Sequence, residues 1–118
     1  MNGGVGVDGL LGGGRAYSFV FNTAPNGLTN FDIIGDYNAA EDTILLAGSV
    51  FAGLSGSVLP AARFVLSKSA NAAVAQIIYD QATGSLFFDA DGTGGGAKVL
   101  CAMLSGSPLL TSADFSII

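Results

Sequence analysis

Short apolar runs, separated by turns rich in glycine and aspartate, recur along the whole chain. Residues 17–22 alternate between apolar and polar side chains, which places Tyr17, Phe19 and Phe21 on one side of an expected strand. Further apolar, β-prone runs follow at 31–37, 43–47 and 98–104. Segments 49–54 and 60–64 are each long enough for one helical turn. Frequent glycine together with Val, Ile, Phe and Thr favours strands over long helices, and the pattern predicts an all-β fold.

A β-hairpin is the most specific local signal. Apolar runs at 76–79 and 85–88 flank the turn sequence of residues 80–84, in which Gly84 suits a left-handed position. Near the end of the chain, Thr111 is a candidate N-cap for a short turn. We expect residues 115–118 to form a closing strand.

An internal repeat occupies the first residues. Residues 3–11 fit the nonapeptide G-G-x-G-x-D-x-U-x, where U is a large apolar residue. Residues 12–20 keep the two leading glycines and have Phe19 at the U position. In this second copy Arg15 replaces the third glycine and Tyr17 replaces the aspartate. The repeat therefore loses its polar positions while it keeps its apolar one.

The net charge of the chain limits the kinds of molecule that it is expected to bind. Nine acidic residues face four basic ones, and the net charge of −5 disfavours nucleic acid and anionic membranes as partners. Eight of the nine acids are aspartate, which is favoured in turns and in calcium-binding loops. No apolar run approaches the ~20 residues of a membrane-spanning helix, so no membrane span is expected.

Several kinds of catalysis are excluded by the residues present. The chain has no histidine, so it contains neither a Ser-His-Asp triad nor an H-E-x-x-H zinc motif. Glycines 4, 6 and 9 match the spacing of a dinucleotide-binding turn, but no strand precedes them and no helix pattern follows. The single cysteine, Cys101, lies in an apolar run and reads as an inert buried thiol, with a reactive or dimer-forming thiol as the alternative. We expect no enzymatic activity.

The ordered motifs resemble a known family. The nonapeptide is similar to the repeats of RTX (repeats-in-toxin, hemolysin-type calcium-binding) proteins. Residues 32–37 and 42–46 resemble the D-x-I-x-D-F … D-x-I-x-L segment that follows such repeats. Residues 78–94 resemble the family's Y-D-x-x-T-G-x-L-x-Y-D-x-D-G-x-G stretch, and residues 110–115 resemble its terminus. The resemblance therefore covers almost the whole chain, in the order of the C-terminal domain found on serralysin-like proteases.

This resemblance implies an architecture. Residues 1–22 would be the last rungs of a parallel β-roll, and residues 23–118 would form a mostly antiparallel β-sandwich or roll that caps it. A cap is needed because the last coil of a solenoid exposes apolar side chains and unpaired edge groups.

The resemblance also implies calcium as the cofactor. In the repeat, Asp8 with the backbone of Gly4 and Gly6 would supply half of a calcium site. Two further groups of aspartates are candidate ligands, since hard oxygen atoms suit calcium. They are Asp32, Asp36 and Asp42, and Asp89 and Asp91. The alternative for Asp8 is a plain turn, and for Asp89 and Asp91 it is a hairpin loop in which the carboxylates bind their own backbone. The other three aspartates would instead cap turns and blunt strand edges.

The expected function follows from the same resemblance. The chain would cap the roll, promote its calcium-dependent folding outside a bacterial cell, and carry the type I secretion signal. Residues Asp114, Phe115, Ile117 and Ile118 are the candidate signal, and the first residues lack the charged and apolar stretches of a signal peptide. The expected partners are upstream repeats of a longer secreted chain and a type I transporter. The alternatives are a binding module of a secreted adhesin, or the end of an RTX protease, lipase or epimerase.

Overall fold

The structure is a computed structural model of the chain. It describes residues 18–21, 31–38, 42–51, 53–54, 59–66, 72–92 and 98–118, together with the backbone of 7–10. Gly4, Gly6 and Tyr17 lie outside the described residues.

The described part of the chain is all-β, as expected from the pattern of apolar runs. Its elements are β1 (Val7–Leu10), β2 (Ser18–Phe21), β3 (Phe31–Ile34), β4 (Thr43–Leu46), the 3₁₀ turn η1 (Ala61–Arg63), β5 (Phe64–Val65), β6 (Gln76–Asp80), β7 (Ser85–Asp89), β8 (Val99–Leu104), the 3₁₀ turn η2 (Ser112–Asp114) and β9 (Phe115–Ile117). Among the described residues there is no helix that is long and apolar enough to cross a membrane.

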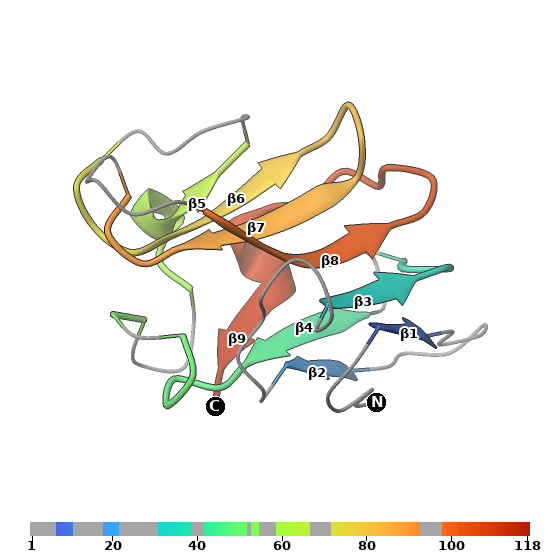
Figure 1. Cartoon of the computed structure of the whole chain (residues 1–118), viewed down its shortest axis with the longest axis horizontal. Helices are drawn as coiled ribbons and strands as arrows, with labels where there is room; N and C mark the ends of the chain where they lie inside the picture. The colour runs from blue at the N-terminus through green and yellow to red at the C-terminus, as the bar shows by residue number, and fades with distance from the viewer. Residues whose placement is uncertain are drawn as a thin grey trace.

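The strands form two sheets that face each other (Figure 1). The order in the six-stranded sheet is β1-β3-β8-β7-β6-β5, and in the three-stranded sheet it is β2-β4-β9. Along the chain, β1, β3 and β8 enter the larger sheet, and each is followed by one strand of the smaller sheet. These strands pair in parallel with their counterparts, so the chain passes three times through the same pair of sheets.

The pairing is more mixed than the sequence led us to expect. Beyond residue 22, β3–β8, β4–β9 and β5–β6 pair in parallel, and only β6–β7 and β7–β8 pair in antiparallel fashion. The expectation of a mostly antiparallel region was therefore wrong for the described strands. The reason is that β3 and β8 are joined through the strands between them and not by a hairpin, so β8 lies beside β3 in the same direction. The division after residue 22 stays a prediction, although β1 and β2 share their sheets with β3 and β4.

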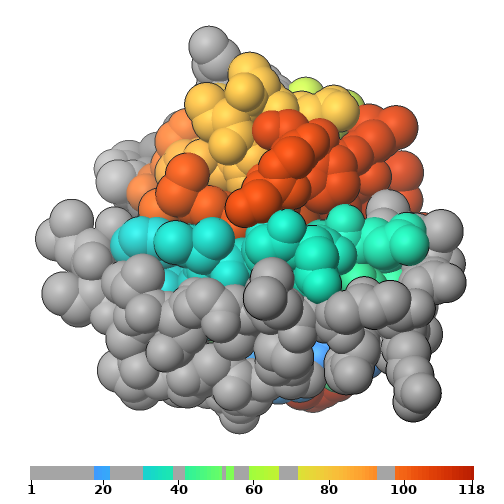
Figure 2. Space-filling model, turned by 90° about the vertical axis from the view of Figure 1, so that its right-hand side faces the viewer, coloured from blue at the N-terminus to red at the C-terminus, as the bar shows by residue number. Residues whose placement is uncertain are grey.

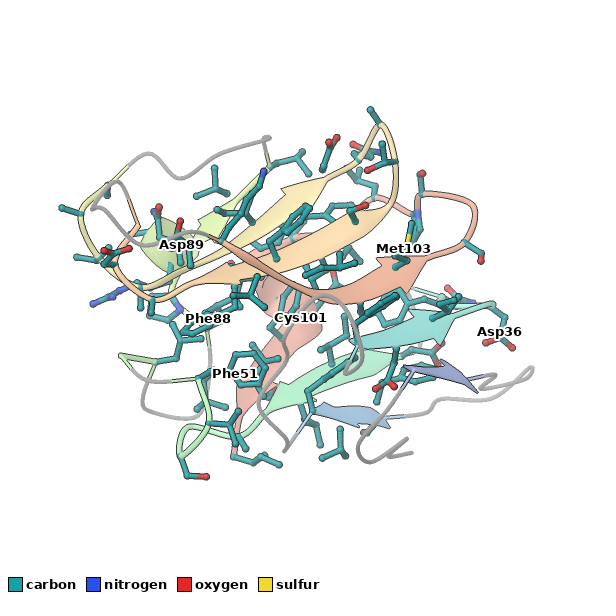
Figure 3. All side chains as sticks on the ribbon, in the orientation of Figure 1. Asp36, Phe51, Phe88, Asp89, Cys101 and Met103 are labelled. Carbon is teal, nitrogen blue, oxygen red and sulfur yellow. The ribbon has the colours of Figure 1, made fainter. Side chains whose placement is uncertain are left out.

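The core lies between the sheets and is rich in aromatic rings. The alternation in β2 points Phe19 and Phe21 inward, and Phe19 is 0% exposed. The ring centroid of Phe19 lies 6.0 Å from that of Tyr37, and Phe51 meets Phe88 edge-on at 5.1 Å. In Figure 3 the Phe51 and Phe88 rings fill the space between the layers. The prediction that Phe19 points into the interior is confirmed.

Local signals placed several turns correctly. Strands β6 and β7 form the expected hairpin, and Gly84 has the left-handed φ of 74°. A Cβ at Gly84 would collide with the carbonyl oxygen of Leu104, so this turn admits only glycine without rearrangement. The expected helical turn at 60–64 is present as η1, and the turn after Thr111 is η2.

Candidate functional site

Asp8 and Asp32 occupy adjacent positions in two successive passes of the chain. The register of the parallel pair β1–β3 sets residue 8 beside residue 32, and on the other side of Asp32 lies Ala102 of β8. Asp32 is buried on the same side of β3 as Ile34. The topology therefore brings together two acidic positions that are far apart in the sequence.

A second group of aspartates surrounds Tyr37. The Tyr37 hydroxyl lies 3.0 Å from the backbone carbonyl oxygen of Asp42, to which it donates, and 3.3 Å from Oδ1 of Asp114. The amide of Asn38 donates to Oδ2 of Asp42 at 2.9 Å, and the amide of Thr111 donates to Oδ2 of Asp114 at 2.8 Å. Both carboxylates are thus held by backbone groups at the ends of short turns.

The aspartates of this group change the pKa of Tyr37. Burial raises the pKa of Tyr37 well above its usual range, and the neighbouring Asp114 and Asp42 raise it further. The hydroxyl therefore stays a hydrogen-bond donor at every ordinary pH. The arrangement joins the turn after β3 to η2, 77 residues later, and its chemistry is structural.

Asp89 and Asp91 form a third group, in the turn that follows β7. The amide of Asp91 lies 3.3 Å from Oδ1 of Asp89, to which it donates, while the Asp91 side chain lies within hydrogen-bonding reach of the Asp89 carboxyl. Asp89 is only 6% exposed, whereas Asp91 is exposed. Burial raises the pKa of Asp89 above its usual value, and the neighbouring Asp91 side chain adds to this increase.

Backbone oxygen atoms approach the same turn. Gly92 has a left-handed φ of 62°, and a Cβ there would collide with the carbonyl oxygens of Ala72 and Val74. The carbonyl oxygens of Ala72 and Val74 therefore lie close to the backbone of Gly92, the residue that follows Asp91. Carboxylate and carbonyl oxygens are hard donors of the kind that calcium prefers.

The three predicted groups of ligands are not a single site. Asp36 and Asp89 lie at opposite ends of the molecule in Figure 3. Within the described part of the chain, no three aspartate, glutamate or cysteine side chains gather closely enough to hold a metal ion. The structure thus does not bring Asp32, Asp36 and Asp42 together as one cluster. Asp42 serves the turn at Asn38 instead.

The residues of the expected export signal are mostly buried in the folded chain. Asp114 binds Tyr37 and Thr111, and Phe115 and Ile117 point from β9 into the core. Only Ile118, at 61%, is largely exposed. In the folded protein this segment closes the smaller sheet beside β4.

Cys101 lies at the centre of β8 with 2% of its surface exposed. Burial raises the pKa of its thiol far above the usual range, which suppresses the reactive thiolate. The large hydrophobic side chains that are exposed within the described segments are all aliphatic: Ile33, Leu66, Val74, Leu109 and Ile118. They offer no aromatic surface for stacking on a ligand.

Two features of these sites had no readable signal in the sequence. The link from Tyr37 to Asp114 depends on a long-range packing of turns, and the carbonyls of Ala72 and Val74 are backbone groups that any residue carries. The Thr111 cap of η2 was predicted, and the reciprocal contact of Asp114 could have been found too, because the two residues have the spacing of a capping box.

The chain was compared with models of known protein families, with curated proteins and with solved structures, and none of the three comparisons gives a match.

Proposed function

We propose that this chain is the non-catalytic C-terminal cap of a calcium-binding β-roll of the RTX type, and that it carries the signal for type I secretion. Support comes first from the strand order. Three passes of the chain alternate between two sheets and stack in parallel, which is how a roll of nonapeptide repeats would grow. Strand β1 lies within the nonapeptide, and a preceding coil of the roll would pack next to this strand.

The way in which the stack ends supports a capping role. After the third pass, the next place in the larger sheet is taken by β7, which runs antiparallel to β8. In the smaller sheet, β9 is the last strand among the described residues. Beyond it, the Phe51 ring packs under Phe88 of the larger sheet. A reversed strand and a packed turn prevent another coil from adding, which is what a solenoid end requires.

Calcium has two candidate places in this proposal. The first is the pair of adjacent positions 8 and 32, where successive coils meet. The second is the turn with Asp89 and Asp91, with the carbonyls of Ala72 and Val74 nearby. Modules that bind calcium at roughly 0.1–1 mM stay empty in the cytosol and fill outside the cell. Folding would then follow export.

Calorimetric titration tests the calcium part. The isolated chain is expected to bind calcium weakly, with no site tighter than about 10 μM. Asp89→Asn and Asp32→Asn should each remove part of the heat. Asp80→Asn is the matched control, because Asp80 only accepts the Ala82 amide in the hairpin turn. Identical titrations for all four proteins would contradict the assignment of these ligands.

The export part is tested with a passenger protein fused before residue 1, in a bacterium that has a type I transporter. Deletion of 115–118 should abolish export. The control is Phe19→Ala, which removes core packing and leaves the tail intact, so its passenger should still be exported. Undiminished export after the deletion would leave residues 115–118 with a structural role alone.

The lack of exposed aromatic side chains among the described residues favours a cap over an adhesin that binds through stacking. An RTX enzyme remains compatible as the parent chain, because its catalytic domain would lie upstream of this segment.

A further inference from the structure

The last part of the chain lies in the middle of the molecule. The described strands before it fall into two groups: a first group of β1–β4 and a second group of β5–β7. No strand of the first group pairs with a strand of the second within the described part of the chain. Strand β8 lies between them, parallel to β3 on one side and antiparallel to β7 on the other. We call residues 99–118 the C-terminal segment.

Neighbouring residues of the C-terminal segment bind opposite groups. The amide of Leu104 donates to the carbonyl of Gly84 at 2.7 Å, and the amide of Ser105 donates to the carbonyl of Ile34 at 2.9 Å. Figure 2 shows the same relation on the surface. The orange-red atoms of this segment separate the yellow atoms of the hairpin from the cyan atoms of residues 31–38.

The side chains repeat this pattern. Tyr79 of the second group donates its hydroxyl to the carbonyl of Pro108 at 2.6 Å, while the hydroxyl of Tyr37, after β3 of the first group, lies 3.3 Å from Oδ1 of Asp114. The segment also adds fully or nearly fully buried side chains to the core: Cys101, Ala102, Leu104, Leu110 and Phe115. Direct contact also includes the edge-on packing of Phe51, in the turn after β4, on Phe88 of β7.

Each group by itself is a poor folding unit. The first has two pairs of short parallel strands, and the second has one hairpin with a two-residue strand beside it. Isolated two-stranded pairs are marginal in water, because they bury too little apolar surface to offset the loss of chain entropy. Without the C-terminal segment, both groups lose buried side chains that pack against them.

We propose that the C-terminal segment, residues 99–118, acts as a folding switch: neither strand group is stable until this segment lies between them, and it leaves only when the whole molecule unfolds. A chain whose last residues are held by another protein therefore stays open. This device is independent of calcium and of export, since it rests on strand order and packing alone.

Cys101 tests the proposal in the unaltered chain. Its buried thiol reacts with a thiol reagent only when β8 opens, so the slowing of labelling relative to the unfolded chain reports the opening equilibrium. The slowing is expected to equal the unfolding equilibrium constant measured by urea denaturation. Labelling of Cys101 about tenfold or more faster than global unfolding allows would overturn the proposal.

Two further probes compare the groups, each with Cys101→Ala. Ala47→Cys reports the first group and Ala75→Cys the second, because both alanines are buried beside β4 and β6. Leu109→Cys, at a side chain 60% exposed, is the control that labels freely. All three buried probes should be protected to the same extent within about threefold, as one cooperative unit requires. Lower protection at residue 101 alone would mean that the segment detaches by itself.

The switch itself is tested with ribosome-bound chains that carry Cys101→Ala and Ala47→Cys. A short C-terminal linker leaves residues 99–118 inside the ribosome, and a long one releases them. Residue 47 is expected to label as in the unfolded chain with the short linker, and to be protected with the long one. Protection with both linkers would show that the first group folds without the C-terminal segment, and would overturn the proposal.

Discussion

The aspartates around Tyr37 and those after β7 are equally close to turns, yet their surroundings differ. Asp42 and Asp114 accept hydrogen bonds from the amides of Asn38 and Thr111, and the Tyr37 hydroxyl lies within hydrogen-bonding distance of the Asp42 carbonyl and the Asp114 side chain. Asp89 also accepts the amide of Asp91, but burial raises its pKa and the neighbouring Asp91 side chain raises it further. A carboxylate held by donors stabilises a fold, while a buried one with a second acid beside it gains from a cation.

The difference teaches how to separate structural aspartates from candidate ligands in a chain with many of them. Sequence spacing treats Asp42 and Asp89 alike, since each stands near a turn beside other acids. What sets Asp89 apart is its burial beside the acidic side chain of Asp91, which together raise its pKa. The following variants should respond to calcium or ignore it accordingly.

The largest effect is expected for Phe19→Ala, which removes the ring that packs against Tyr37. Loss of a fully buried aromatic side chain should lower the free energy of unfolding by about 3–5 kcal/mol in urea denaturation. Val20→Ala is the matched control on the same strand, because Val20 is only half-buried on the opposite side. A loss below about 1 kcal/mol for Phe19→Ala would show that the register of the repeat is wrong.

Asp114→Ala should have the next largest effect. It removes the acceptor of the Thr111 amide and of the Tyr37 hydroxyl, and leaves both donors without that partner. The expected loss is about 1–2 kcal/mol, from the lost cap of η2 and the lost contact with the Tyr37 hydroxyl, which keeps the Asp42 carbonyl as a partner. Thermal unfolding with and without calcium should show the same loss. If the loss of stability differed with calcium present, the aspartates around Tyr37 would be calcium ligands.

Calcium should stabilise the chain through the other group. At about ten times the dissociation constant, a ligand that binds only the folded state adds about 1.4 kcal/mol to the free energy of unfolding. Asp89→Asn should lose the part of this gain that comes from the turn after β7, and Asp80→Asn should retain all of it. The melting temperature of each variant, measured against calcium concentration, tests this difference. Equal stabilisation of both variants would place the ion elsewhere.

The smallest effect concerns pH in calcium-free buffer. The pKa of Asp89 is raised on folding, so the folded state favours the protonated form. The stability that this group contributes is full below its unfolded pKa of about 4, and it declines as the pH rises through the folded pKa. Asp89→Asn removes this decline, so the variant should gain relative to the unmodified chain between acid and neutral pH. A pH-independent difference between the two proteins would contradict the raised pKa.

Much of the local structure followed from the sequence. The alternation in β2, the hairpin around Gly84 and the closing strand β9 were all predicted, because side-chain period and turn chemistry are properties of neighbouring residues. The candidate ligands Asp89 and Asp91 were also singled out from sequence, although the carbonyls near them were not.

What the sequence determined by itself was the all-β character, the inward face of β2 and the left-handed turn at Gly84, since these depend on interactions within a few residues. Only the tertiary structure decided that β8 joins β3 to β7, that Tyr37 meets Asp114, and that the pairing beyond residue 22 is mixed. Strands with similar apolar patterns can pair in many orders. The order is chosen by the joint burial of both sheet faces and the closure of long loops, to which residues from the whole chain contribute.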